Sequence, residues 1–189
     1  MMGGMPGQAP VMVVNQNAQR ETGRKAQLGN ITAAKAVSDI VRTTLGPRSM
    51  LKMLLDAQGS IVLTNDGNAI LREIDVAHPA AKSMVDLSRA QDEEVGDGTT
   101  SVVILAAELL RRANQLVKNK IHPTSIMTGY RLALKSAVKY IKKNLTVPIT
   151  TLGEANLKNA AMTSMSSKII GPECEFFGDM CVKAVTRVR

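Results

Sequence analysis

Aromatic side chains are scarce in this chain. Its 189 residues include no tryptophan, two tyrosines and two phenylalanines. Proteins that bind single-stranded nucleic acid commonly stack the bases on aromatic rings, so the composition argues against a nucleic-acid partner. The 44% of hydrophobic residues is nevertheless enough to form a core. We expect that core to be aliphatic, with the eleven methionines as adaptable filling.

Cysteines are equally few. On a shared helix, Cys174 and Cys181 would be ~10 Å apart along the axis, too far for a disulfide bond. Neither histidine has metal-ligand spacing to them. We therefore expect two small buried residues in a protein of a reducing compartment.

Long apolar runs are absent as well. The longest, residues 102–107, is far too short to cross a bilayer. The N-terminus is rich in Met, Gly, Pro and Gln and lacks the basic flank and apolar segment of a signal peptide. We expect a cytoplasmic protein with no membrane partner, and a disordered tail at residues 1–10.

Negative charge is missing from one long stretch. The chain carries a net charge of +8, and residues 111–143 contain nine Lys or Arg and no Asp or Glu. Within this stretch a basic ridge recurs every four residues, formed by Arg131, Lys135, Lys139 and Lys143. We interpret the basic ridge as a solvated helix face. The alternatives are contact with an acidic subunit or polyanion, as in a small basic nucleic-acid-binding or scaffold protein.

What the chain does have is strong helical periodicity, which predicts a mainly α protein with a small β-hairpin (α+β). Asn30 is expected to cap the first helix, and Gly46-Pro47 to stop it. The helix from Ser101 is apolar nearly all round at its start, which predicts deep burial. The expected strands are 11–14, 53–55 and 61–64, with a turn at 56–59, and the expected helices are 30–45, 69–73, 79–91, 101–119, 123–144, 154–161 and one from about 172.

A candidate ligand motif introduces the helix from Ser101, with the sequence Gly96-Asp97-Gly98-Thr99-Thr100-Ser101. A helix start has unpaired N–H groups and a partial positive charge, which favour a phosphate. Asp97 would repel that phosphate unless a cation such as Mg²⁺ lay between them. The alternative is an ordinary helix start with Asp or Thr as its N-cap.

Two further turns are also candidate ligand motifs, although each alone can be explained by ordinary turn chemistry. One is Thr44-Leu45-Gly46-Pro47 at a helix end, and the other is Thr64-Asn65-Asp66-Gly67 after a strand. No Gly-Lys-Ser/Thr follows a strand, so a nucleotide site here would not be of the P-loop type.

Together, in this order and at these separations, the three motifs resemble the nucleotide-binding motifs of the chaperonins. The segment Thr163-Ser164-Met165-Ser166-Ser167-Lys168 is similar to one typical of group II chaperonins, the archaeal and eukaryotic cytosolic type. The resemblance implies an equatorial ATPase domain whose first piece is residues 11–146, followed by the start of an intermediate domain at 147–189. The apical domain and the returning pieces would be absent, as in a fragment, a truncated product or an incomplete gene model.

The resemblance also implies a role for each site residue. ATP and Mg²⁺ would be the ligands, with Asp97 holding the metal and Asp66 assisting the attacking water. Leu45, Gly46 and Pro47 would line the nucleotide. Its phosphates would be bound by Gly98, Thr99, Thr100 and Ser101. The residues that would reach it from the intermediate domain are Ser166, Ser167 and Lys168.

A second family carboxylate lies in a returning piece, so hydrolysis is expected only in the full-length assembled subunit. The implied partners are other chaperonin subunits in a hetero-oligomeric ring and unfolded client proteins, which the apical domain would bind. After Lys168, the apolar Ile169 and Ile170 are expected to be buried.

Overall fold

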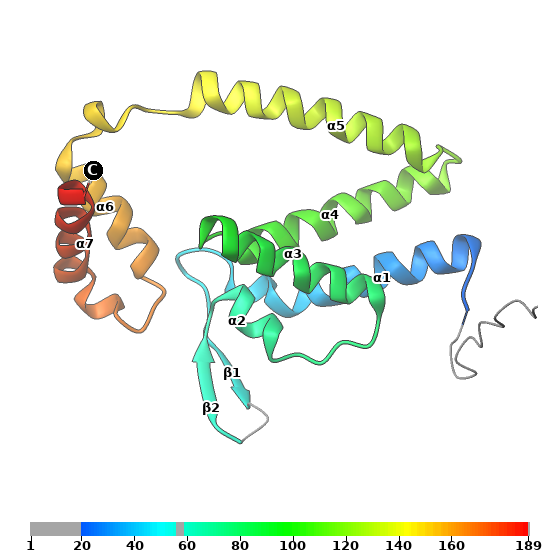
Figure 1. The fold of residues 1–189 in the computed structure, drawn as a ribbon, viewed down its shortest axis with the longest axis horizontal. Helices are drawn as coiled ribbons and strands as arrows, with labels where there is room; N and C mark the ends of the chain where they lie inside the picture. The colour runs from blue at the N-terminus through cyan, green and yellow to red at the C-terminus, as the bar shows by residue number, and fades with distance from the viewer. Residues whose placement is uncertain (1–19, 56–58, 189) are drawn as a thin grey trace, which may run out of the picture.

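The computed structural model describes residues 20–55 and 59–188. It confirms a mainly α protein with a two-stranded antiparallel sheet (Figure 1). The expected strand at 11–14, the tail at 1–10 and most of the turn at 56–59 lie outside the described residues. The elements are α1 (Gly23–Val41), β1 (Lys52–Leu55), β2 (Ile61–Thr64), α2 (Gly67–Arg72), α3 (Pro79–Val95), α4 (Thr99–Lys118), α5 (Pro123–Tyr140), α6 (Ile149–Met165) and α7 (Cys174–Val188).

The first helix begins earlier than predicted. It starts at Gly23, so Asn30 lies inside the helix and does not cap it. The intervening residues include Arg, Lys, Ala, Gln and Leu, all good helix formers. An i,i+4 ion pair of 2.9 Å between Glu21 and Lys25 adds local support. The helix gives way at Val41 to a short 3₁₀ turn, and Gly46 follows with φ +89°, as the Gly-Pro stop predicts.

The helix that leads into the 163–168 segment also starts earlier than expected. α6 begins at Ile149, and Gly153 inside it has φ 71° and ψ 161°, which kinks the helix. The expected start near residue 154 therefore corresponds to the part after the kink. A glycine is suited to this position because other residues rarely adopt such a backbone conformation.

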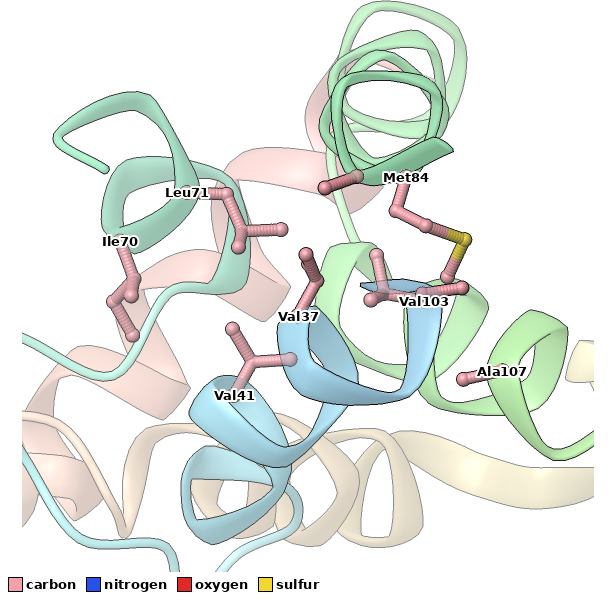
Figure 2. Packing of buried hydrophobic residues seen from close by; sticks show 9 residues of the cluster. Val37, Val41, Ile70, Leu71, Met84, Val103 and Ala107 are labelled. Carbon is pink, nitrogen blue, oxygen red and sulfur yellow. The ribbon is translucent and has the colours of Figure 1, made fainter. Parts of the chain in front are cut away.

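The core lies among α1, α2, α3 and α4. Figure 2 shows Val37 and Val41 of α1 facing side chains of the neighbouring helices, including Leu71 and Val103. Each of these four side chains is at most 2% exposed. Burial of one such side chain contributes about 1.5–3 kcal/mol, so this cluster fixes the relative positions of the four helices.

The prediction of deep burial at the start of α4 is only half right. Val103 and Ala107 are buried, whereas Leu105 on another face of the same helix is 60% exposed. The helix packs against α1 and α3. Its remaining face therefore keeps apolar surface uncovered within the described part of the chain.

The long helix α5 runs from the end of α4 across one side of the molecule to α6 (Figure 1). Near its start Ile126 is buried, and the Tyr130 hydroxyl donates a hydrogen bond of 2.9 Å to the Leu109 carbonyl oxygen. Every residue from 131 to 150 is exposed, including all four members of the basic ridge. The periodic apolar face of α5 is thus present, but most of it is uncovered.

α6 and α7 pack against each other at the far end of α5 (Figure 1). A side chain at Gly178 would come within 2.9 Å of Met162, so the two helices approach closely. Cys174 is half-buried and Cys181 is exposed on α7, which contradicts the expectation that both are buried. Among the described residues, no helix combines the length and the apolar character needed to cross a membrane.

Candidate functional site

Four separate parts of the chain enclose one cavity of about 320 Å³. They are the turn after α1, the end of β2, the start of α4 and the end of α6 with the turn that follows it. The cavity contains every predicted site residue except one. Those lining it are Leu45, Gly46, Pro47, Asp66, Asp97, Gly98, Thr99, Thr100, Ser101, Ser167 and Lys168.

The exception is Ser166, which lies beside the cavity without lining it. Its single hydroxyl proton is shared between the Thr163 carbonyl oxygen at 2.8 Å and the Pro47 carbonyl oxygen at 3.2 Å. The contact with Pro47 spans 119 residues of sequence and joins the turn after α6 to the turn after α1. Ser166 therefore connects two walls of the cavity.

The start of α4 is open to the cavity. Its N-cap is Gly98, in the left-handed conformation with φ 78°, and no side chain caps the first turn. The alternative of an ordinary start capped by Asp or Thr is therefore wrong. The first N–H groups of α4 have no intrahelical carbonyl to bond, so with Thr99 and Thr100 beside them they can bind an anion.

Asp97 immediately precedes Gly98, the N-cap of α4. Its Oδ1 accepts a hydrogen bond of 2.7 Å from the Gly98 N–H, and its main-chain oxygen accepts one of 2.9 Å from Gln91 Nε2. These bonds orient the exposed carboxylate where it lines the cavity. The described residues contain no cluster of three or more His, Cys, Asp or Glu suited to a metal. Mg²⁺ is commonly held by one or two carboxylates plus substrate phosphates, so a single carboxylate beside an anion site fits this ion.

Both carboxylate oxygens of Asp66 accept hydrogen bonds from the protein. Asp66 is the N-cap of α2, where Oδ2 accepts from the Ala69 N–H at 2.9 Å. Its Oδ1 accepts from the Thr99 hydroxyl at 3.0 Å, which links α2 to α4. A carboxylate oxygen can accept more than one hydrogen bond, so Asp66 can still bind a water in the cavity.

Gly67 permits a close approach that sequence reasoning did not identify. A Cβ at this position would lie 2.5 Å from Thr100 Oγ1 and 2.9 Å from the Thr100 backbone nitrogen. Only glycine allows the starts of α2 and α4 to meet in this way. The residue therefore sets the spacing between Asp66 and the start of α4.

Asn65 is the second residue of this turn to which sequence reasoning assigned no individual role. Its side chain is buried and donates from Nδ2 to Ser49 Oγ at 2.9 Å and to the Ser167 carbonyl oxygen at 3.0 Å. Its Oδ1 accepts from Lys168 Nζ at 2.7 Å. No local signal could have revealed these contacts, since two of the partners lie more than 100 residues further along the chain.

Beyond Lys168 the turn is open to solvent. Ile169 is 73% exposed and Ile170 is 39% exposed, so the expectation that both are buried is wrong. The turn is held instead by polar bonds to Asn65 and Pro47.

The cavity lies wholly within a segment that matches a known family. Residues 37–189 match the TCP-1/cpn60 chaperonin family, and the chain belongs to that family. The resemblance noted from the three turn motifs is confirmed.

Curated relatives define the kind of subunit to which the chain is similar. It is 56% identical over 184 residues to T-complex protein 1 subunit gamma of Oxytricha granulifera, covering 97% of this chain and 33% of that protein. It is 50% identical over 185 residues to subunit gamma of Bos taurus, covering 98% of this chain and 34% of that protein. It is also 54% identical over 171 residues to subunit alpha of Tetrahymena pyriformis, covering 90% of this chain and 31% of that protein. The chain thus spans about a third of the length of the relatives it matches.

Proposed function

We propose that this chain binds Mg-ATP in the cavity, as part of a chaperonin subunit that assists the folding of other proteins. The observation that carries the proposal is the convergence of four distant segments around the uncapped start of α4, with the Asp97 carboxylate beside it. An anion site next to a lone carboxylate is the combination that a metal-bound phosphate needs.

In this proposal each wall of the cavity has a separate task. The N–H groups and hydroxyls at the start of α4 bind phosphate oxygens, and Asp97 holds the metal. Gly46 has no side chain, so the turn after α1 leaves room there for the rest of the nucleotide. Lys168 reaches the terminal phosphate from the opposite wall, where an ammonium group acts as a point charge.

Hydrolysis is proposed only for the full-length assembled subunit. Asp66 would orient the attacking water there, since both of its oxygens are already fixed by the protein. When bound, Mg²⁺ supplies charge neutralisation at the phosphates. The chain's own contribution is to bind, position and partly enclose the nucleotide.

The division into domains is part of the same proposal. Residues 11–146 would form the first piece of an equatorial domain, and residues 147–189 the start of an intermediate domain. The exposed apolar side chains of α4 and α5 support the proposal that these helices pack against other parts of a larger assembly, because exposed apolar surface can mark an interaction site. The partners would be other subunits of a hetero-oligomeric ring in the cytoplasm, with unfolded proteins as clients of the complete subunit.

Calorimetric titration of the chain with ATP, in the presence of Mg²⁺ or EDTA, tests the binding proposal. We expect saturable binding that EDTA strongly weakens. The same heat signal with and without Mg²⁺ would contradict it. Size-exclusion chromatography of native material tests assembly, because co-migration with a very large ring is expected. A monomer whose polyanion binding falls steeply with salt would favour the basic-protein alternative.

A further inference from the structure

The Asn65 side chain joins three partners from two other parts of the chain. It is 5% exposed, and its amide group bonds Ser49 in the turn region after α1. On the other side it bonds both the Ser167 carbonyl oxygen and the Lys168 ammonium group. Both polar atoms of the carboxamide are therefore occupied, and Asn65 is the point where the end of β2 meets the turn after α6.

The bond to Lys168 fixes a group that would otherwise move freely. Lysine has a flexible four-carbon side chain, and holding it in one geometry costs about 2 kcal/mol of rotamer entropy. The residue as a whole is exposed, so packing contributes little to its position. The 2.7 Å bond from Nζ to Asn65 Oδ1 holds the ammonium group against the cavity wall.

The chemistry of the partner matters as much as its position. An ammonium group has three donors, and Asn65 engages one of them. The carboxamide is neutral, so it orients Lys168 without cancelling its positive charge. A carboxylate in the same place would hold the side chain and also neutralise it.

We propose that Asn65 is a positioning residue that holds Lys168 ready for the terminal phosphate of a nucleoside triphosphate. Asn65 thereby raises the preference of the cavity for ATP over ADP. This inference rests on the proposed nucleotide-binding function, because it assigns the source of selectivity within that site. Asn65 acts through Lys168 and need not touch the nucleotide.

A double-mutant cycle on the chain tests the inference. Calorimetry would measure the affinities for Mg-ADP and for a non-hydrolysable Mg-ATP analogue in the parent, Asn65→Ala, Lys168→Met and the double variant. We expect Asn65→Ala to lower the ATP-to-ADP affinity ratio about tenfold, the lower end of the range for one hydrogen bond to a charged group. We expect Lys168→Met to lower the ratio at least as much. The double variant should match Lys168→Met, because Asn65 has nothing left to position.

Controls separate positioning from folding. Lys142→Met removes another exposed lysine, in the segment after α5 and away from the nucleotide cavity, and should leave the ratio unchanged. If Asn65→Ala loses its cooperative thermal transition, Asn65→Ser takes its place in the cycle, since it keeps a small polar side chain. A general loss of structure would weaken ADP and ATP binding alike, and the ratio would not move.

Each outcome decides a different point. Absence of binding of both nucleotides to the parent chain would overturn the proposed function, and the inference with it. Binding by the parent with an unchanged ratio in Asn65→Ala would overturn the positioning role alone. A double variant whose fold-loss equals the product of the two single fold-losses would also overturn it, because independent effects mean that Asn65 does not act through Lys168.

Discussion

The hydroxyl of Thr99 donates a hydrogen bond to the carboxylate of Asp66, with 3.0 Å between Oγ1 and Oδ1. The two residues are 33 positions apart. Thr99 is the first residue of α4, and Asp66 is the N-cap of α2. One bond therefore joins the proposed phosphate-binding helix to the carboxylate proposed to orient water.

Asp66→Asn should separate chemistry from structure. The asparagine oxygen can still accept from Ala69 or Thr99, so the local fold should persist. In an assembled full-length ring, we expect hydrolysis to fall about 10²-fold or more, with little change in ATP affinity, because a water-orienting carboxylate acts mainly in the transition state. Steady-state hydrolysis and equilibrium binding would measure both. Asp39→Asn, on the exposed face of α1, is the matched control, and an unaltered turnover rate in Asp66→Asn would leave Asp66 as a helix cap only.

Asp97→Ala should remove the metal dependence of binding. Without this carboxylate the cation loses its protein ligand beside the phosphates, and we expect Mg-ATP affinity to fall at least about thirtyfold. Calorimetry with and without EDTA would measure the loss. Glu94→Ala removes a nearby exposed acid that does not line the cavity, and it should bind Mg-ATP as the parent does. Unchanged affinity in Asp97→Ala would refute the metal assignment.

Gly67→Ala should disturb the contact between α2 and α4. The added methyl group would lie 2.5 Å from Thr100 Oγ1, so the two helix starts must move apart. We expect a loss of about 1–3 kcal/mol in the free energy of unfolding, as for other overpacked sites. A methyl group added at Gly129 in α5 would meet nothing within 4 Å, and Gly129→Ala should be neutral or stabilising by up to about 1 kcal/mol. Thermal unfolding followed by circular dichroism would compare them, and equal stability of both variants would contradict the close approach.

Acid should weaken an ion-pair cluster on α4. Hydrogen bonds from Arg111 and Arg112 lower the pKa of Glu108 from an ordinary value of 4.5 to about 2. Because the folded-state pKa lies below the unfolded one, this contribution to stability is present above pH 4.5 and is lost as the pH falls towards 2. The side chains of Glu108, Arg111 and Arg112 are 37%, 42% and 64% exposed, so solvent screens the cluster. The effect should therefore be small and should shrink further with added salt. Thermal midpoints of the parent and Glu108→Gln should differ at neutral pH and converge near pH 2, and a constant difference would contradict the assignment.

Local chemistry predicted the stop after the first helix, although several other helix ends differ from those expected. Gly46 adopts a left-handed backbone conformation where the Gly-Pro pair indicated that stop. The hairpin also followed from its short apolar runs, and its register pairs Lys52 with Thr64. These features depend on neighbours within a few residues, which is why a single sequence contains enough information to find them.

The cavity itself could not be derived in that way. Its walls lie far apart in sequence, and only the resemblance to the chaperonins suggested that they meet. The contacts of Asn65 with Ser167 and Lys168 depend on how α6 is placed, which no periodicity encodes. Burial was mispredicted for the same reason, since Leu105 and Ile169 are apolar but have no covering element in the described chain.

The α6–α7 pair adds no side chain to the buried core cluster, whose described members all come from α1, α2, α3 and α4. Near the cavity, the turn after α6 is held instead by hydrogen bonds. Ser166 donates to Pro47 and Lys168 donates to Asn65, while the Ser167 carbonyl oxygen accepts from Asn65. The neutral bonds each contribute only about 0.5–1.5 kcal/mol net and the bond from the Lys168 ammonium group about 1.5–3 kcal/mol, and water can replace them. A nucleotide touching both sides of the cavity would therefore shift the balance between attached and detached arrangements of this turn. By thermodynamic reciprocity, any partner that holds the turn in the attached arrangement must raise nucleotide affinity by the same factor.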